Sequence, residues 1–225
     1  MRPIKLTVAG LVVVVAIIGT VACTTASSSA RSVSEAFAPD APGNMPQSTP
    51  LPAPSFNTAP RGELGRAKTG NGGEVTEADG ALPDGVTVFD DEYPGIANLD
   101  PHLLRALREA AKDASNDRVE VTINSGWRSR SYQDALLRTA VAEYGSVDEA
   151  ERWVATADTS PHVSGNAVDV GSADGTTWLS KHGAEYGLCQ IYRNEPWHFE
   201  LRPDATEGGC PRMYADPTQD PRMQN

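Results

Sequence analysis

The placement of the large apolar side chains is the feature that most limits what this 225-residue chain can fold into. The stretch 24–80 consists mainly of Ser, Ala, Pro, Gly, Thr and Asn, and large apolar residues are few there. Such a composition cannot bury enough apolar surface to offset the entropy of ordering the backbone. We therefore expect a disordered Pro/Ala/Ser/Gly-rich tether over 24–80 and one folded domain, within the usual size range, over 81–212.

The first 23 residues have the organisation of an export signal. Arg2 and Lys5 precede an uncharged, mostly apolar run that ends at Cys23. A basic start, an apolar centre and small residues at the end are typical of such segments. The run is also about long enough to cross a bilayer, which takes ~20 apolar residues. The segment 1–23 is thus a signal peptide or a membrane anchor, and its end resembles a bacterial lipobox with Cys23 as the lipidated residue. Lipidation, an uncleaved anchor and plain secretion all place the rest of the chain outside the cytoplasm.

The other cysteines agree with export. If Cys23 carries lipid, Cys189 and Cys210 remain as an even pair. Outside the cytoplasm such a pair tends to form a disulfide, although two unrelated buried thiols are the alternative. A bond here would close a loop of about 20 residues around two predicted strands.

The charge of the chain argues against one class of partner. The formal net charge is −11 and the pI is about 4.8. Proteins that bind nucleic acid normally present a basic surface, so we expect no nucleic-acid partner.

Regular patterning begins near Leu82 and predicts an α+β domain. Asp100 followed by Pro101 is a helix start, and apolar residues then recur at helical spacing. Alternating apolar and polar residues predict strands. Helices are expected at 100–115, 131–145, 146–155 and 174–187, strands at 118–123, 166–171, 189–193 and 197–201, and a loose polar tail at 213–225.

The stretch "SPHVSGNAVDV" (160–170) contains the first two candidate metal ligands, His162 and Asp169. Gly165 predicts a turn between them. In the strand that follows, Ala167 and Asp169 share one face. A histidine in a loop folded over a strand aspartate can reach a common point. A solvated aspartate beside a turn is the plainer interpretation of these residues alone.

The stretch "NEPWHFE" (194–200) supplies a third candidate ligand and a carboxylate. Two neutral imidazoles and one carboxylate, with a fourth position left to water, are a common catalytic zinc set. Glu195, three residues before His198, is close enough in sequence to accept a proton from that water. A surface carboxylate and a partly buried histidine are the alternatives.

The stretch "SGWRSRSYQ" (125–133) follows directly on a predicted strand. Arg128 would project from the strand end, where pockets are usually built. A guanidinium suits a planar carboxylate or a developing oxyanion. A solvated charge is the alternative for an isolated arginine.

Together the three stretches resemble VanY-type D-alanyl-D-alanine carboxypeptidases. The resemblance rests on Ser125-Gly126-Trp127-Arg128-Ser129 with Gln133, on Ser160-x-His162-x-x-Gly165-x-Ala167-x-Asp169, and on Glu195-x-Trp197-His198. The blocks occur in the family's order over roughly 82–202. VanX-type dipeptidases share the core of this pattern. One departure is Trp127, where the family more often has Tyr or Phe.

The resemblance implies a fold, a metal and a set of roles. The fold would be a small hedgehog-like or D-Ala-D-Ala-peptidase-like domain with a central antiparallel sheet flanked by helices. Zn²⁺ would be held by His162, Asp169 and His198, with Glu195 as the catalytic base. Arg128 would steady the substrate carbonyl or its terminal carboxylate. Gln133 and Ser160 would lie in the substrate pocket.

The expected function is removal of the terminal D-Ala from peptidoglycan stem peptides at the bacterial cell envelope. The same zinc machinery serves several bonds, so an endopeptidase or a peptidase for another peptidoglycan linkage is an alternative. A non-catalytic wall-binding module is an alternative from a different class. Such modules normally lack a ligand or the base, and all four residues are present here.

Overall fold

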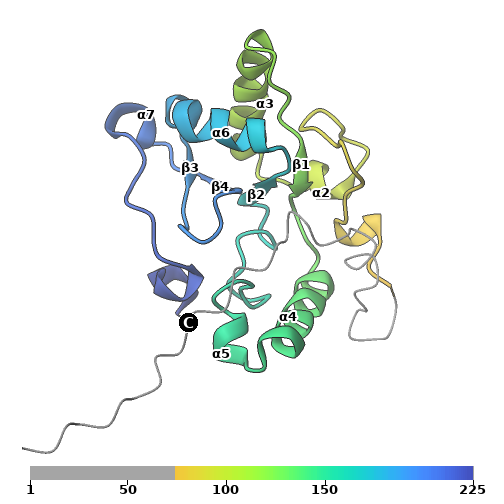
Figure 1. Cartoon of the computed structure of the whole chain (residues 1–225). Helices are drawn as coiled ribbons and strands as arrows, with labels where there is room; N and C mark the ends of the chain where they lie inside the picture. Colours follow the sequence, from red (N-terminus) through yellow and green to blue (C-terminus); the bar gives the residue numbers. More distant parts are fainter. Residues whose placement is uncertain (1–73, 225) are drawn as a thin grey trace, which may run out of the picture. The chain divides into compact units, whose positions relative to one another are not determined.

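The computed structural model describes residues 74–224. The predicted leader, Cys23 and nearly all of the predicted tether lie outside these residues. In the described part of the chain, a four-stranded antiparallel sheet has the order β1-β2-β4-β3 (Figure 1). The strands are β1 (Ile123–Ser125), β2 (Ala167–Val170), β3 (Leu188–Gln190) and β4 (His198–Leu201).

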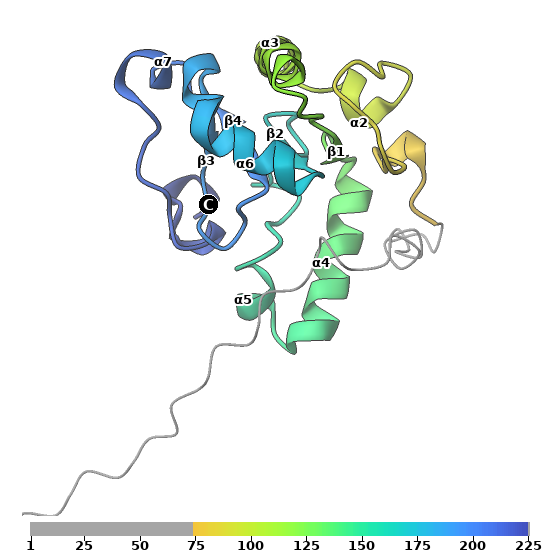
Figure 2. The ribbon, with the colours of Figure 1, turned by 45° about the horizontal axis from the view of Figure 1, so that its top comes forward.

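Helices surround this sheet on both sides. The α-helices are α2 (Pro94–Ala97), α3 (Pro101–Asn116), α4 (Arg130–Tyr144), α5 (Val147–Ala150), α6 (Ala173–His182) and α7 (Ala205–Gly208). Short 3-10 helices span Glu77–Asp79, Gly183–Tyr186, Pro217–Gln219 and Pro221–Met223. Figures 1 and 2 both show α3 and α6 on one side of the strands and α4 and α5 on the other. The predicted α+β class with a central antiparallel sheet flanked by helices is confirmed.

The two longest helices begin where local chemistry dictates. The Asp100 carboxylate accepts hydrogen bonds from the backbone N–H groups of His102 and Leu103, so α3 starts at Pro101 as predicted. The Ser129 hydroxyl caps α4 by accepting from Tyr132 N–H. This helix ends at Gly145, which adopts a left-handed conformation at φ 81°.

Of the three hydrophobic clusters in the described residues, two position the elements around the site. The larger one packs α3 and α6 against the sheet, and it includes Leu107, Val168, Val170 and Phe199. The smaller one joins α4 and α5 through residues such as Leu136 and Val154. Because Val168 and Val170 point into the larger cluster, Asp169 between them points to the other face.

Several element boundaries differ from the sequence-based expectation. The third predicted helix, 146–155, is helical only over Val147–Ala150. Beyond it, Trp153 stacks on Tyr144 with ring centroids 6.2 Å apart, and Val154 is buried in the smaller cluster. These contacts draw the chain off the helix axis. The strand predicted at 118–123 is shifted to β1, since Arg118 adopts a positive φ of 64° as the chain leaves α3.

The C-terminal tail is the largest correction. We expected 213–225 to be loose, yet Pro217–Gln219 and Pro221–Met223 form 3-10 helices, and the Asp220 residue is fully buried. Ion pairs and capping bonds, which composition does not reveal, hold these polar residues. None of the helices within residues 74–224 is both long enough and apolar enough to cross a bilayer.

Candidate metal centre

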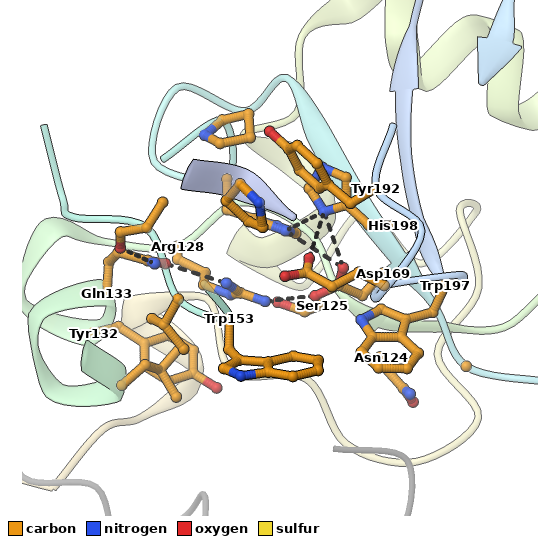
Figure 3. A pocket seen from close by; sticks show the side chains of 18 of the residues that line it. Asn124, Ser125, Arg128, Tyr132, Gln133, Trp153, Asp169, Tyr192, Trp197 and His198 are labelled. Atoms are coloured by element: carbon orange, nitrogen blue, oxygen red, sulfur yellow. Dashed lines mark hydrogen bonds and ion pairs between the residues drawn. The ribbon is translucent and has the colours of Figure 1, made fainter. Parts of the chain in front are cut away.

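Three predicted ligands, His162, Asp169 and His198, come together at one point on the sheet (Figure 3). Asp169 in β2 and His198 in β4 are directly paired across neighbouring strands. His162 reaches them from the loop before β2. The loop turns at Gly165, whose φ is +73° and where a Cβ atom would come within 2.5 Å of the Asn98 carbonyl oxygen. A side chain at this position would therefore displace the loop that carries His162.

The second nitrogen of each imidazole has a partner that orients the ring. His162 Nδ1 lies 2.8 Å from the Gly126 carbonyl oxygen, to which it donates a hydrogen bond as Nδ1–H. His198 Nε2 lies 3.2 Å from Glu200 Oε1 and donates to this carboxylate. These contacts leave His162 Nε2 and His198 Nδ1 as the atoms that can bind a metal. Partners of this kind fix the tautomer and ring orientation of metal-binding histidines.

The three available donor atoms have the spacing of a tetrahedral zinc site. His162 Nε2 and His198 Nδ1 are 3.3 Å apart, and they lie 3.4 and 3.3 Å from Asp169 Oδ1. Ligands bound tetrahedrally to zinc at ~2.0–2.1 Å stand ~3.3–3.4 Å from one another. Asp169 Oδ1 is buried and has no hydrogen-bond partner in the described part of the chain. A buried carboxylate oxygen without a partner is costly unless a cation meets it, so the residues fit a metal ion.

The electrostatics of the cluster also favour a cation. Burial lowers the pKa of His162. Burial would lower the pKa of His198 as well, but the neighbouring carboxylates Asp169 and Glu200 raise it to about 10. Burial would raise the pKa of Asp169, yet the two imidazoles and Arg128 hold it well below its usual range. A buried site that draws a proton onto an imidazole attracts a metal cation for the same reason.

Glu195 lies beside the three ligands and is chemically suited to move a proton. Its Oε2 is 3.8 Å from His198 Nδ1, and its Oε1 is buried without a hydrogen-bond partner in the described chain. Burial raises the pKa of Glu195 to about 8, against the opposing effect of His198. A carboxylate that binds a proton near neutral pH can both accept and return it.

Arg128 holds Asp169 from the side opposite the two imidazoles. Its Nη2 donates to Asp169 Oδ2 at 2.6 Å, and its Nε donates to Ser125 Oγ at 2.7 Å. Its Nη1 donates to Gln133 Oε1 at 3.1 Å. The two oxygens of Asp169 therefore differ, because Oδ2 meets the guanidinium and Oδ1 faces the imidazoles.

These residues face a cavity of about 430 Å³. Arg128, Gln133, His162, Asp169, Glu195 and His198 all line it, together with Trp153 and Trp197. Figure 3 shows the two indole rings beside the arginine and the ligand cluster. Its lining extends along the chain from Asp84 to Met223, so the fold, and no single stretch of sequence, creates the cavity.

The comparisons with known proteins agree with this geometry. The family model VanY, described as D-alanyl-D-alanine carboxypeptidase, matches residues 97–204. This match covers a little less than half of the chain, and it includes all three candidate metal ligands. The resemblance seen in the sequence is confirmed.

Individual relatives share part of this domain. A D-alanyl-D-alanine carboxypeptidase of Enterococcus faecalis is 29% identical over 140 residues, which cover 49% of this chain and 52% of the relative. The chain thus spans about half the length of this curated relative. A mutant of the vancomycin-resistance D,D-pentapeptidase VanY, solved in complex with Zn(II), is 26% identical with a TM-score of 0.45, covering 50% of this chain and 80% of that one. The L,D-carboxypeptidase LdcB is 21% identical with a TM-score of 0.46, covering 60% and 72%.

One residue that we expected in the pocket occupies a different place. Ser160 is 4% exposed, its hydroxyl has no hydrogen-bond partner in the described chain, and it is not among the residues that line the cavity. The next residue, Pro161, lines the cavity instead. Ser160 precedes a turn that points its neighbours inward.

Two residues of the site, Glu200 and Trp153, were not predicted from the sequence. Glu200, which accepts from His198, was expected to be an ordinary strand residue. The signal was available, since His198 and Glu200 are two positions apart in a strand and therefore share a face. Trp153, which was placed in a helix, instead forms a wall of the cavity.

The predicted disulfide between Cys189 and Cys210 is present, with Cα atoms 5.5 Å apart. It joins β3 to the chain after α7. Because β3 pairs with β4, the bond lies one strand away from the metal ligand His198.

Proposed function

We propose that this chain is a zinc-dependent D-alanyl-D-alanine carboxypeptidase that removes the terminal D-Ala from peptidoglycan stem peptides. The observation that carries the proposal is the set of three convergent donors, His162 Nε2, His198 Nδ1 and Asp169 Oδ1, with a buried carboxylate beside them. The match of residues 97–204 to the VanY family supports the same reaction.

The proposed metal site consists of His162, Asp169 and His198. Zn²⁺ supplies Lewis-acid chemistry, which acidifies water and polarises a carbonyl group. The protein's part is to present two imidazoles in the correct tautomers and one free carboxylate oxygen. Gly126 and Glu200 fix the tautomers, and Arg128 fixes the carboxylate.

Glu195 would act as the general base and then as the general acid. It accepts a proton from the attacking water and passes it to the leaving amine of D-Ala. Its raised pKa, caused first by burial, suits both steps because the proton is bound neither too weakly nor too strongly near neutral pH. Trp153 and Trp197 would hold the peptide against these groups and limit access of bulk water.

Arg128 would recognise the negative end of the substrate. A carboxypeptidase distinguishes a chain end from a chain middle by the terminal carboxylate. The Arg128 side chain is 13% exposed and lines the cavity. A guanidinium has five N–H groups, more than its three partners use. A developing oxyanion at the scissile carbonyl is the other group it can stabilise.

The place of action follows from the substrate. Peptidoglycan lies outside the cytoplasmic membrane, so we propose that the domain works in the bacterial cell envelope. Attachment through the segment 1–23, by lipid on Cys23 or by an uncleaved anchor, remains part of this proposal. The tether would let the domain reach wall peptides at a distance from the membrane.

The deciding experiment compares a stem peptide that has a free carboxyl terminus with the same peptide amidated, with fragments identified by mass. We expect D-Ala release only from the free form. Equal cleavage of both would identify an endopeptidase, release at another linkage would identify a different wall peptidase, and binding without cleavage would identify a wall-binding module.

Replacement of Arg128 tests the role of the guanidinium in the same assay. Arg128→Ala should lower kcat/KM. The loss should correspond to ~2–4 kcal/mol of transition-state stabilisation, as when an oxyanion donor is removed. Arg128→Lys should recover only part, because an ammonium lacks the planar fork. The matched control is Arg130→Ala, since the Arg130 side chain is 61% exposed and pairs with Asp158. Zinc content is measured in each variant, because Arg128 also contacts Asp169.

A further inference from the structure

The C-terminal segment Asp216–Met223 lies beside the metal centre although it follows the family match, which ends at residue 204. Pro217 and Met223 line the same cavity as the ligands. Asp220 is 0% exposed and Asp216 is 5% exposed. A polar chain end that is buried to this degree requires specific partners.

Arg222 and Asp220 form the centre of these contacts. Asp220 accepts hydrogen bonds from Arg222 Nε at 3.0 Å to each oxygen, and an ion pair joins its Oδ2 to Nη2. Arg222 also reaches across to β4, where Nη1 donates to Glu200 Oε2 at 2.7 Å and Nη2 donates to Oε1 at 3.3 Å. The guanidinium therefore bridges a tail carboxylate and a strand carboxylate.

Glu200 links the Arg222 guanidinium to the candidate metal ligand His198. Its Oε1 accepts from His198 Nε2 at 3.2 Å, and its side chain is only 1% exposed. Arg202 holds the other oxygen at 2.7 Å. Of these two arginines, Arg222 touches both carboxylate oxygens, so it limits rotation of the carboxylate as well as neutralising it.

A second contact from the tail reaches the same imidazole. Tyr192 donates its hydroxyl hydrogen to Asp220 Oδ2 at 3.1 Å. The Tyr192 ring packs against the His198 ring, with centroids 5.1 Å apart. Arg222 and Asp220 thus act on His198 by two routes. Arg222 acts through Glu200 at the Nε2 atom, and Asp220 acts through Tyr192 at the imidazole ring.

We propose that Arg222 is a positioning residue for the metal ligand His198. It holds Glu200 where that carboxylate accepts the Nε2 proton, and so keeps His198 Nδ1 directed at the point shared with His162 and Asp169. The proposal rests on the proposed function for the identity of the metal. It makes the segment Asp216–Met223 an integral part of the site, and it means that the matched segment 97–204 alone lacks a complete site.

The test measures the zinc dissociation constant of the full chain by competition with a chromophoric chelator at 25 °C. Partners of metal-binding histidines typically contribute ~10–100-fold to metal affinity. We expect Arg222→Ala to weaken zinc binding about tenfold or more. Arg222→Lys should lie between this variant and the parent, because an ammonium can keep the contact with one oxygen of Glu200.

Two further variants separate positioning from general stability. Arg212→Ala removes the same charge from an exposed position in the same part of the chain and should bind zinc within about twofold of the parent. Glu200→Gln keeps the shape and the acceptor oxygen at His198 but removes the charge that Arg222 meets, so it should also weaken zinc binding. This variant keeps the proposal testable if Arg222→Ala does not fold.

Each outcome has a distinct meaning. Unchanged zinc affinity in folded Arg222→Ala, with only a lower melting temperature of the chelated protein, would overturn the positioning role and leave the proposed function intact. Unchanged affinity in Glu200→Gln would overturn it as well. A parent chain that binds no zinc would overturn both this proposal and the proposed function.

Discussion

At the scale of single residues, the atoms of one buried side chain can have different roles in the site. Asp169 illustrates this, since Oδ2 accepts from Arg128 while Oδ1 is left for a cation. Two carboxylates near the same imidazole also behave in opposite ways. Burial raises the pKa of Glu195 to about 8, whereas Glu200, also buried, has its pKa held well below the usual range by His198 and Arg222. One is suited to exchange a proton and the other to remain a fixed anion.

The pKa of Glu195 predicts the acidic side of the pH profile. A base must be deprotonated to accept a proton, so kcat/KM should fall as the pH drops through the pKa of Glu195. Burial raises that pKa from 4.5 toward about 8, and a bound cation opposes the shift. We therefore expect the acidic limb between these two values, measured on the zinc-loaded enzyme.

The variant Glu195→Gln should lose this limb and lower turnover ~100-fold or more, while it retains zinc. Zinc content by elemental analysis is the control. An unchanged acidic limb in this variant would assign the base to another group.

At the scale of elements, the antiparallel pairing of β2 with β4 does most to build the site. It sets Asp169 opposite His198, and the pairing of β1 with β2 sets Ser125 opposite Asp169. The loop before β2 then needs only the turn at Gly165 to bring in His162. Because side chains alternate along a strand, a one-residue slip of β4 would turn His198 into the hydrophobic core.

The disulfide also acts between elements, because it joins β3 to the chain that leads into the C-terminal segment. Its two cysteines are 21 residues apart. Closing a loop of this length is worth roughly 3 kcal/mol in the chain-entropy description. We expect the double variant Cys189→Ser, Cys210→Ser to lose about this much free energy of unfolding in a denaturant titration.

Thiol counting on the unreduced parent provides the control for this prediction, and it should find both cysteines oxidised. A double variant as stable as the parent would show that the folded chain holds β3 without the bond. Reduction of the parent should lower its stability by the same amount as the substitutions.

At the scale of the whole molecule, the site lies between the sheet and the smaller of two hydrophobic clusters, while the larger cluster packs behind the sheet. The larger cluster supports the sheet that carries Asp169 and His198, and the smaller one supports the chain that carries Trp153 and Gln133. A metal ion bound here would contact residues from the loop before β2, from β2 and from β4. Binding should therefore stabilise the folded state as a whole.

Zinc should accordingly raise the melting temperature of the chelated protein. At a free zinc concentration 100 times the dissociation constant, binding contributes ~2.7 kcal/mol. For a protein of this size the shift is roughly 5–10 °C. Differential scanning calorimetry of chelated and zinc-loaded samples measures it.

The matched variant is Asp169→Ala, which lacks the free carboxylate oxygen and should show little or no zinc-dependent shift. An equal shift in this variant would place the stabilising ion elsewhere in the protein.

Local features of this fold were predictable from short stretches of sequence. Helix starts at Asp100 and Ser146, the stop at Gly145 and the alternation around Asp169 were all predictable, since each depends on residues within a few positions of one another. The family motifs also identified the metal-ligand candidates before their geometry was known. Motifs of this kind work because the chemistry requires the same few residue types in the same order.

Contacts between residues far apart in the sequence could not be predicted in this way. The order β1-β2-β4-β3, the burial of Asp220 and the bridge from Arg222 to Glu200 join positions that local patterns do not connect. The tail illustrates the reason most clearly. Its polar composition predicts a solvated chain end, and it is ordered because buried charges elsewhere in the fold supply its partners. Pairing between charges far apart in sequence depends on the completed fold, and no window of the sequence contains it.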